Sequence, residues 1–138
     1  MMLPDVNVLV ALTNPAHQHH HQAHHWLRGV RSFATTPVTE SGLVRLLLNR
    51  AVTGQQVTLA TALGLLRGIR EDPRATFLPD DSSLSDPHID LVGFAGHRQT
   101  TDLHLVNLAA RHGASLATFD RRLRDVLVPA DQRHVHAI

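Results

Sequence analysis

Short apolar segments alternate with segments of helical periodicity along the whole chain, and this alternation restricts the fold more than any other feature. Asn14-Pro15 and Thr36-Pro37 each place a capping residue before a proline, which is typical of a helix start. The pattern predicts strands over residues 2–9, 32–35, 75–78, 115–119 and 134–138, and helices over residues 15–28, 37–47, 55–70, 88–95, 102–112 and 121–126. Strands that alternate with helices predict an α/β domain built on a parallel sheet.

The length and the residue types narrow the class of protein further. A chain of 138 residues predicts a single domain, which at this size buries roughly two-thirds of the surface of its unfolded chain. The chain has no cysteine, which excludes disulfides and thiolate metal sites and fits a cytoplasmic location. Pro4, Asp5 and Asn7 interrupt the apolar start, so we expect a buried strand there and neither a signal peptide nor a membrane segment.

Four acidic residues fall where a parallel sheet forms its sites. Ligand sites in such sheets lie at the carboxyl ends of the strands. Asp5 lies near the end of the first expected strand and Asp120 directly follows the 115–119 strand. Glu40 lies one turn into the helix after the second strand, and Asp102 opens the helix that leads into the 115–119 strand. We therefore expect these four carboxylates to share one edge of the sheet.

Each acid also has an ordinary structural explanation. Asp102 suits a first helical turn because the helix dipole favours a negative charge there, and Asp120 suits a cap of the helix that begins at Arg121. For Glu40 a capping role is a weaker explanation, because Glu40 falls one residue after the capping-box position, Thr39. Asp5 is the hardest to explain this way, because it interrupts an apolar stretch and a buried, unpaired carboxylate costs several kcal/mol.

Four stretches in one order resemble a known family. They are Leu3-Pro4-Asp5-Val6-Asn7-Val8-Leu9, Pro37-Val38-Thr39-Glu40, Thr101-Asp102-Leu103-His104-Leu105 and Ala117-Thr118-Phe119-Asp120-Arg121. In this order and spacing the chain resembles a PIN-domain nuclease, and within that family a VapC-type toxin of a toxin–antitoxin pair. The resemblance implies one PIN-like domain over residues 1–138, with three α/β/α layers and a central, mainly parallel sheet of four to five strands.

The resemblance also implies an activity, a cofactor and partners. The activity is endoribonuclease cleavage of RNA by a metal-activated water, with Mg²⁺ as the cofactor and Mn²⁺ as a substitute. The implied partners are a VapB-like antitoxin and a second copy of the chain. A larger toxin–antitoxin assembly is an alternative to the dimer. A PIN nuclease that acts in RNA processing and is not a toxin stays as an alternative.

The residue chemistry agrees with a metal site. Carboxylates held close together raise one another's pKa, and a divalent cation with a preference for oxygen ligands relieves that repulsion. We expect Asp5 and Asp102 to be the central metal ligands. Glu40 is expected to act directly or through a water, and Asp120 to complete a second metal position or to hold a water.

Several polar neighbours complete the predicted site. Asn7 and Thr118 are expected to orient the carboxylates, with local backbone hydrogen bonding as the alternative. All thirteen basic residues are arginine, the side chain that binds phosphate with two hydrogen bonds. Arg98, Arg121 and Arg122 lie next to the acids in sequence, so they are candidates for RNA phosphate contacts or for ordinary solvated side chains.

A histidine-rich segment is the unusual part of the chain. Histidines crowd residues 17–25, and the pairs His17/His21, His20/His24 and His21/His25 would each share a helical face. Such pairs bind Zn²⁺ or Ni²⁺ in some proteins, so a metal-binding module without nuclease activity is a third hypothesis. A solvated helix face is the simpler interpretation.

Overall fold

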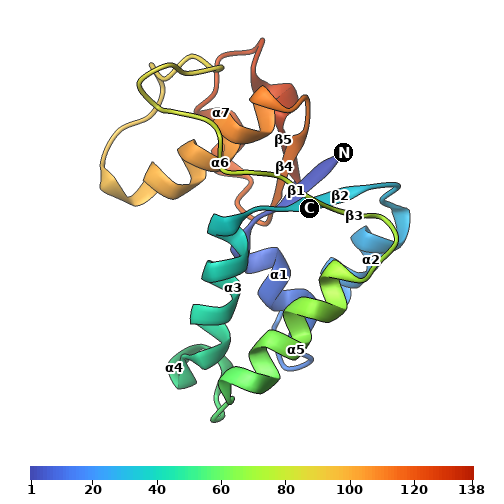
Figure 1. Cartoon of the computed structure of the whole chain (residues 1–138). Coiled ribbons are helices and arrows are strands. Elements are labelled where there is room, and N and C mark those ends of the chain that lie inside the picture. Colours follow the sequence, from blue (N-terminus) through green and yellow to red (C-terminus); the bar gives the residue numbers. More distant parts are fainter.

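The computed structural model describes residues 1–138 and contains one five-stranded sheet (Figure 1). Its strands are β1 (Met2–Pro4), β2 (Phe33–Thr35), β3 (Ala75–Phe77), β4 (Ser115–Thr118) and β5 (Val135–Ala137). They lie in the order β3-β2-β1-β4-β5, and all four neighbouring pairs are parallel. The predicted parallel sheet is confirmed, with its last strand at an edge.

Seven α-helices and two 3₁₀ turns connect the strands. The helices are α1 (Val6–Thr13), α2 (His20–Gly29), α3 (Pro37–Leu48), α4 (Arg50–Thr53), α5 (Leu59–Arg70), α6 (Thr100–Arg111) and α7 (Arg122–Asp125), with η1 at His97–Gln99 and η2 at Gln132–His134. None of them is both long and apolar enough to cross a membrane.

Helices cover both faces of the sheet, which gives the expected three layers. Leu3 and Leu116 pack on one face with buried residues of α6 and α7, among them Leu105 and Leu123. Ala117 faces the opposite side, where it packs with Val8 of α1 and Trp26 of α2. A further cluster joins α1, α3 and α5, which extend away from the sheet in Figure 1.

The strand order creates a switch point at the centre of the sheet. The chain builds β2 and β3 on one side of β1 and later returns to place β4 and β5 on the other side. Connections therefore leave the carboxyl ends of β1 and β4 in opposite directions, and the crevice between them is where such folds bind ligands. Asp5 and Thr118 lie at these two strand ends.

Three sequence expectations about the first half of the chain are wrong in their boundaries. β1 stops at Pro4 because Asp5 caps α1, which begins at Val6. Asn14 ends α1 and its side chain accepts a hydrogen bond from Ala16 N, so the next helix starts only at His20. The helix expected over 55–70 begins at Leu59, after a Thr58 cap.

The helix expected over residues 88–95 is absent. The backbone N–H of His88 donates to Asn107 Oδ1 at 2.7 Å, and that of Asp90 donates to Asp131 Oδ2 at 2.8 Å. These bonds tie the segment to α6 and to the turn before β5. Two of its backbone donors are therefore used by distant side chains instead of by a helix of its own.

The second half otherwise follows the prediction closely. α6 covers Thr100–Arg111, and Gly113 beyond its end has a φ of 63°, a left-handed conformation that glycine adopts without strain. α3 begins as predicted at Pro37, and there Thr39 Oγ1 accepts a hydrogen bond from Thr36 N and donates one to Thr36 O, both at 3.1 Å.

Candidate active site

Asp5 is a buried carboxylate held in one orientation at the end of β1. Its Oδ1 accepts a hydrogen bond from Val8 N at 3.0 Å, and its Oδ2 accepts one from Thr118 Oγ1 at 2.5 Å. Burial raises the pKa of Asp5, the bonds from Thr118 and Val8 lower it, and the charge of Asp120 raises it. The N-cap bond gives Asp5 a structural role, and the Thr118 hydroxyl bonds its other carboxylate oxygen.

Asp102 lies in the first turn of α6 with no hydrogen bond or ion pair from the rest of the chain. Its pKa is raised from 3.8 to about 6, first by burial, then by the charge of Asp5 and then by that of Asp120. The three aspartates therefore lie close enough to repel one another. No cation of the chain relieves this repulsion.

Asp120 has the capping role that was expected for it as a structural alternative. Its Oδ1 accepts a hydrogen bond from Arg122 N at 3.0 Å, so it caps the short helix α7. Its own N–H donates to Thr118 Oγ1 at 3.1 Å. The Thr118 hydroxyl thus links the strand-end backbone to the Asp5 carboxylate, and Asp120 stays at the exposed edge of the acidic group.

Glu40 is not part of this acidic group. Thr35 Oγ1 donates to Glu40 Oε1 at 2.6 Å, and Arg70 Nε lies 3.4 Å from the same oxygen. Glu40 does not contribute to the raised pKa of either Asp5 or Asp102. The structure therefore brings together three of the four predicted acids and places the fourth beside Arg70.

A hollow of about 200 Å³ opens between α1, α3 and α6, and both central aspartates line it. Exposed Asn7 lies beside them at its wall. Arg45 of α3 lines the same hollow. Arg45 is far from Asp5 and Asp102 along the chain, so no sequence pattern singles it out, and only the packing of α3 brings it to their hollow.

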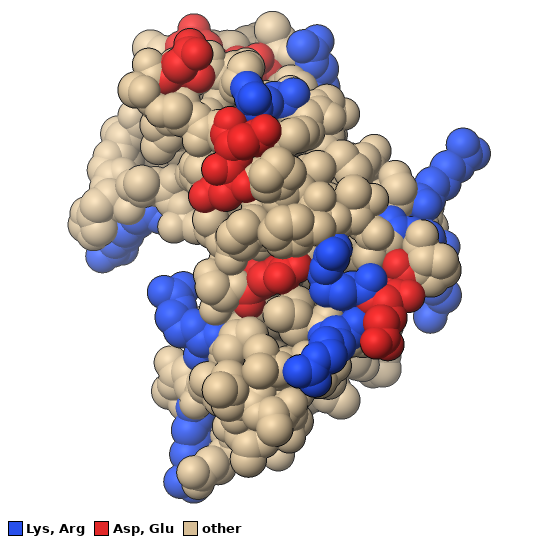
Figure 2. Space-filling model, viewed as in Figure 1, with Lys and Arg blue, Asp and Glu red and all other residues tan.

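The three predicted arginines all lie on the surface. Arg98 belongs to η1, immediately before α6, and Arg121 precedes α7; neither forms an ion pair. Arg122 Nε lies 3.7 Å from Asp120 Oδ1. Figure 2 shows arginine side chains above and below the indentation of the left flank.

The donor set suits a divalent cation that prefers oxygen. Asp5 and Asp102 offer carboxylate oxygens, and a bound cation would offset the burial and the neighbouring negative charges that raise the pKa of Asp102. No three acidic or histidine side chains of the chain are arranged close enough to hold a metal by themselves. A cation at Asp5 and Asp102 would therefore keep most of its waters, as Mg²⁺ does in proteins.

The histidine segment divides into anchored and free residues. His20 Nδ1 donates to Ala11 O at 2.7 Å and His24 Nε2 donates to Leu12 O at 2.9 Å, so both rings bind the end of α1. His21 and His25 are exposed. Because α2 begins at His20, the predicted helical pairing of His17 with His21 is wrong.

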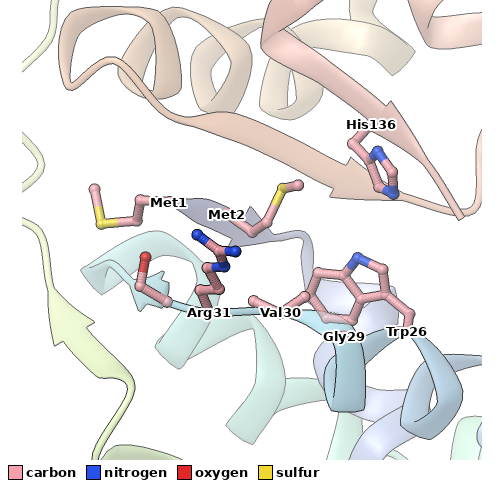
Figure 3. A pocket seen from close by; sticks show the side chains of 8 residues that line it. Met1, Met2, Trp26, Gly29, Val30, Arg31 and His136 are labelled. Atoms are coloured by element: carbon pink, nitrogen blue, oxygen red, sulfur yellow. The ribbon is translucent and has the colours of Figure 1, made fainter.

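Another hollow, of about 430 Å³, lies away from the acids (Figure 3). It contains no carboxylate, so it is not a candidate for metal-dependent chemistry. Its lining residues come from the start of the chain, the end of α2 and β5: Met1, Met2, Trp26, Gly29, Val30, Arg31, Ser32 and His136.

The chain is similar in sequence and in fold to known proteins. The family model described as PIN domain matches residues 2–127. The chain is 44% identical over 132 residues to Ribonuclease VapC39 of Mycobacterium tuberculosis, which covers 89% of this chain and 91% of that protein. It is 41% identical over 122 residues to Ribonuclease VapC38 of the same organism, with 87% and 85% covered. The fold is shared with a solved structure of M. tuberculosis VapC20, which is described as a toxin that cleaves the sarcin–ricin loop. The TM-score is 0.63 at 14% sequence identity, and the match covers 87% of this chain and 92% of that chain.

Proposed function

Because the chain belongs to the PIN-domain family and to its VapC-type ribonucleases, we propose that it is an endoribonuclease toxin whose catalysis depends on a divalent cation held by Asp5 and Asp102. The observation that carries the proposal is that these two carboxylates line one hollow at the switch point of the sheet, with raised pKa values and no compensating cation.

The chain's own residues prepare this site before any cation binds. The Val8 N–H and the Thr118 hydroxyl hold the two oxygens of Asp5, so its orientation is fixed. Asp102 projects from the first turn of a rigid helix. When bound, Mg²⁺ or Mn²⁺ supplies a water of lowered pKa and neutralises charge on the phosphate.

Asp120 and Glu40 take supporting roles in this proposal. Asp120 lies near enough to Asp102 to raise its pKa, and we assign it to a second cation position or to an ordered water. Glu40 already accepts a hydrogen bond from Thr35 and lies within ion-pair distance of Arg70, so we propose that it contacts the cation only through a water. Asn7, at the wall of the hollow, is assigned to orienting the carboxylates or their waters.

The partner proposals follow from the family. We propose that residues 1–138 act as one PIN domain and that the chain forms a homodimer. We also propose that a VapB-like antitoxin inhibits it, either as a complex with one dimer or in a larger toxin–antitoxin assembly. A PIN nuclease of RNA processing would share the same acidic site. Growth arrest on expression that Asp5→Ala relieves would favour the toxin.

Cleavage of total RNA tests the chemistry. Wild-type protein should cleave RNA in Mg²⁺ or Mn²⁺ and stop in EDTA, and Asp5→Asn or Asp102→Asn should lower the rate by about a hundredfold or more, as losing an electrostatic group at a reacting centre typically does. Asp125→Asn, an exposed acid of α7, is the matched control and should cleave normally. Cleavage that continues in EDTA would refute the metal mechanism.

A further inference from the structure

Arg45 lies where three hollows of the surface meet. It lines the acidic hollow together with Asp5 and Asp102. It also lines the adjoining hollow of about 440 Å³, which shares Thr101 with the first, and a third of about 620 Å³, which shares Ser41 with the second. The three hollows therefore adjoin one another along α3, and the first of them contains the carboxylates.

The packing of α3 on α1 places Arg45 at this junction. A Cβ at Gly42 would lie 2.7 Å from Val6 Cγ2, so any larger residue here would force the Val6 side chain or the helices to shift. Arg45 is three residues further along α3, hence on the same helical face. Val6 is the first residue of α1, next to its cap Asp5, and Val6 and Arg45 line the same two hollows.

The charge of Arg45 is not used within the chain. Its side chain is exposed and forms no ion pair or hydrogen bond, although two carboxylates line the same hollow. Arg70 and Arg122, by contrast, each lie within ion-pair distance of an acid. A free guanidinium beside an acidic site is suited to an anion that arrives from solution.

We propose that Arg45 binds a phosphate of the RNA strand at the carboxylate site and so positions the strand for cleavage. This inference rests on the ribonuclease function proposed above. RNA must bring its negative backbone to a wall of carboxylates, and a guanidinium on the facing wall offsets that repulsion with two parallel hydrogen bonds. The Ser41 and Thr101 hydroxyls in the adjoining hollow add donors for neighbouring phosphates.

The test compares two exposed arginines of neighbouring helices. Arg45→Gln removes the proposed phosphate ligand, whereas Arg50→Gln changes an arginine of α4 that lines none of the three hollows. Binding of a labelled single-stranded RNA is measured by fluorescence anisotropy in an Asp102→Asn background, and kcat/KM is measured in the otherwise wild-type enzyme. Melting temperatures check that both variants fold.

Arg45→Gln should weaken RNA binding and lower kcat/KM by about tenfold, and it should reduce the slope of log K against log salt by about 0.7, the share of one phosphate contact on a single strand. Arg45→Lys should keep the slope but recover only part of the affinity, because it lacks the planar fork. Arg50→Gln should change binding less than twofold.

Two results would overturn the inference. One is RNA binding and cleavage by Arg45→Gln within twofold of the parent protein while the parent cleaves RNA. The other is unchanged RNA binding with a loss of antitoxin affinity, which would assign Arg45 to the protein partner. A wild-type protein that cleaves no RNA would instead refute the proposed function itself.

Discussion

At the scale of single residues, Asp102 makes a pH-dependent contribution to stability. Its folded-state pKa of about 6 exceeds the ordinary 3.8, so between these values the folded chain holds a proton that the unfolded chain releases. The free energy of unfolding of the metal-free protein therefore falls as pH rises through this window, and the lost stability is not regained above it.

Replacing Asp102 by a neutral residue should restore the stability that is lost when its carboxyl group ionises. In EDTA at pH 7.5, Asp102→Asn should melt a few degrees above wild type, and the difference should shrink by pH 5. Mg²⁺ should raise the melting temperature of wild type more than that of the variant, because a ligand of the folded state stabilises it. Equal melting temperatures at pH 7.5 in EDTA would contradict the raised pKa. Comparing the two proteins at each pH cancels the titration of the twelve histidines.

Thr118 is the residue whose hydroxyl connects two of the acids. Thr118→Val keeps the shape of the side chain but removes the donor to Asp5 and the acceptor of the Asp120 N–H. Cleavage should fall about 10- to 100-fold, the usual cost of losing a group that orients a metal ligand. Thr118→Ser keeps the hydroxyl and serves as the control. Wild-type kcat/KM for Thr118→Val would show that Asp5 needs no such support.

At the scale of elements, the histidines join α1 to α2. The carbonyls of Ala11 and Leu12 at the end of α1 would have no partner within their own helix, and His20 and His24 bind them. Replacing both histidines by alanine should lower the free energy of unfolding by about 1–3 kcal/mol, measured by urea denaturation. The same change at exposed His21 and His25 should have little effect.

The same variants decide the hypothesis of a metal-binding module. Each anchored ring already gives one nitrogen to a carbonyl. We therefore expect RNA cleavage per folded molecule to survive both double replacements. A loss of cleavage on replacing His21 and His25, with the fold intact, would mean that the segment takes part in function.

At the scale of the whole molecule, exposed aliphatic side chains gather where α3, α4 and α5 meet. Leu48, Val52 and Leu59 are 41%, 41% and 54% exposed, and they lie at the end of α3, in α4 and at the start of α5, the lower tip in Figure 1. Side chains of this kind often mark a contact with another protein. We place the proposed homodimer contact here.

Light scattering tests that placement. Wild-type chain should have the mass of a dimer, and Leu59→Asp should shift it to a monomer by burying a charge in the contact. Val92→Asp is the control, since Val92 is 78% exposed but lies in the loop before η1. A dimer that persists in Leu59→Asp would move the contact elsewhere.

The amino-acid sequence by itself determined the kinds of element and the place of most acids. A capping residue before Pro37 and a glycine after α6 act on their own backbone, so these helix ends were predictable. Asp5, Asp102 and Asp120 follow strands or open helices, and a parallel sheet gathers such positions at one edge. The early end of β1 was missed because the Asp5 cap competes with an apolar pattern that suits either a strand or a helix.

Only the tertiary structure decided which side chains meet. Glu40 and Arg45 lie on the same helix, yet Glu40 lies beside Arg70, whereas Arg45 lines the hollow of Asp5 and Asp102. That placement depends on the close contact of Gly42 with Val6, residues far apart in the chain. Periodicity and capping report local preferences of the backbone, whereas the partner of a side chain depends on how whole helices pack against one another.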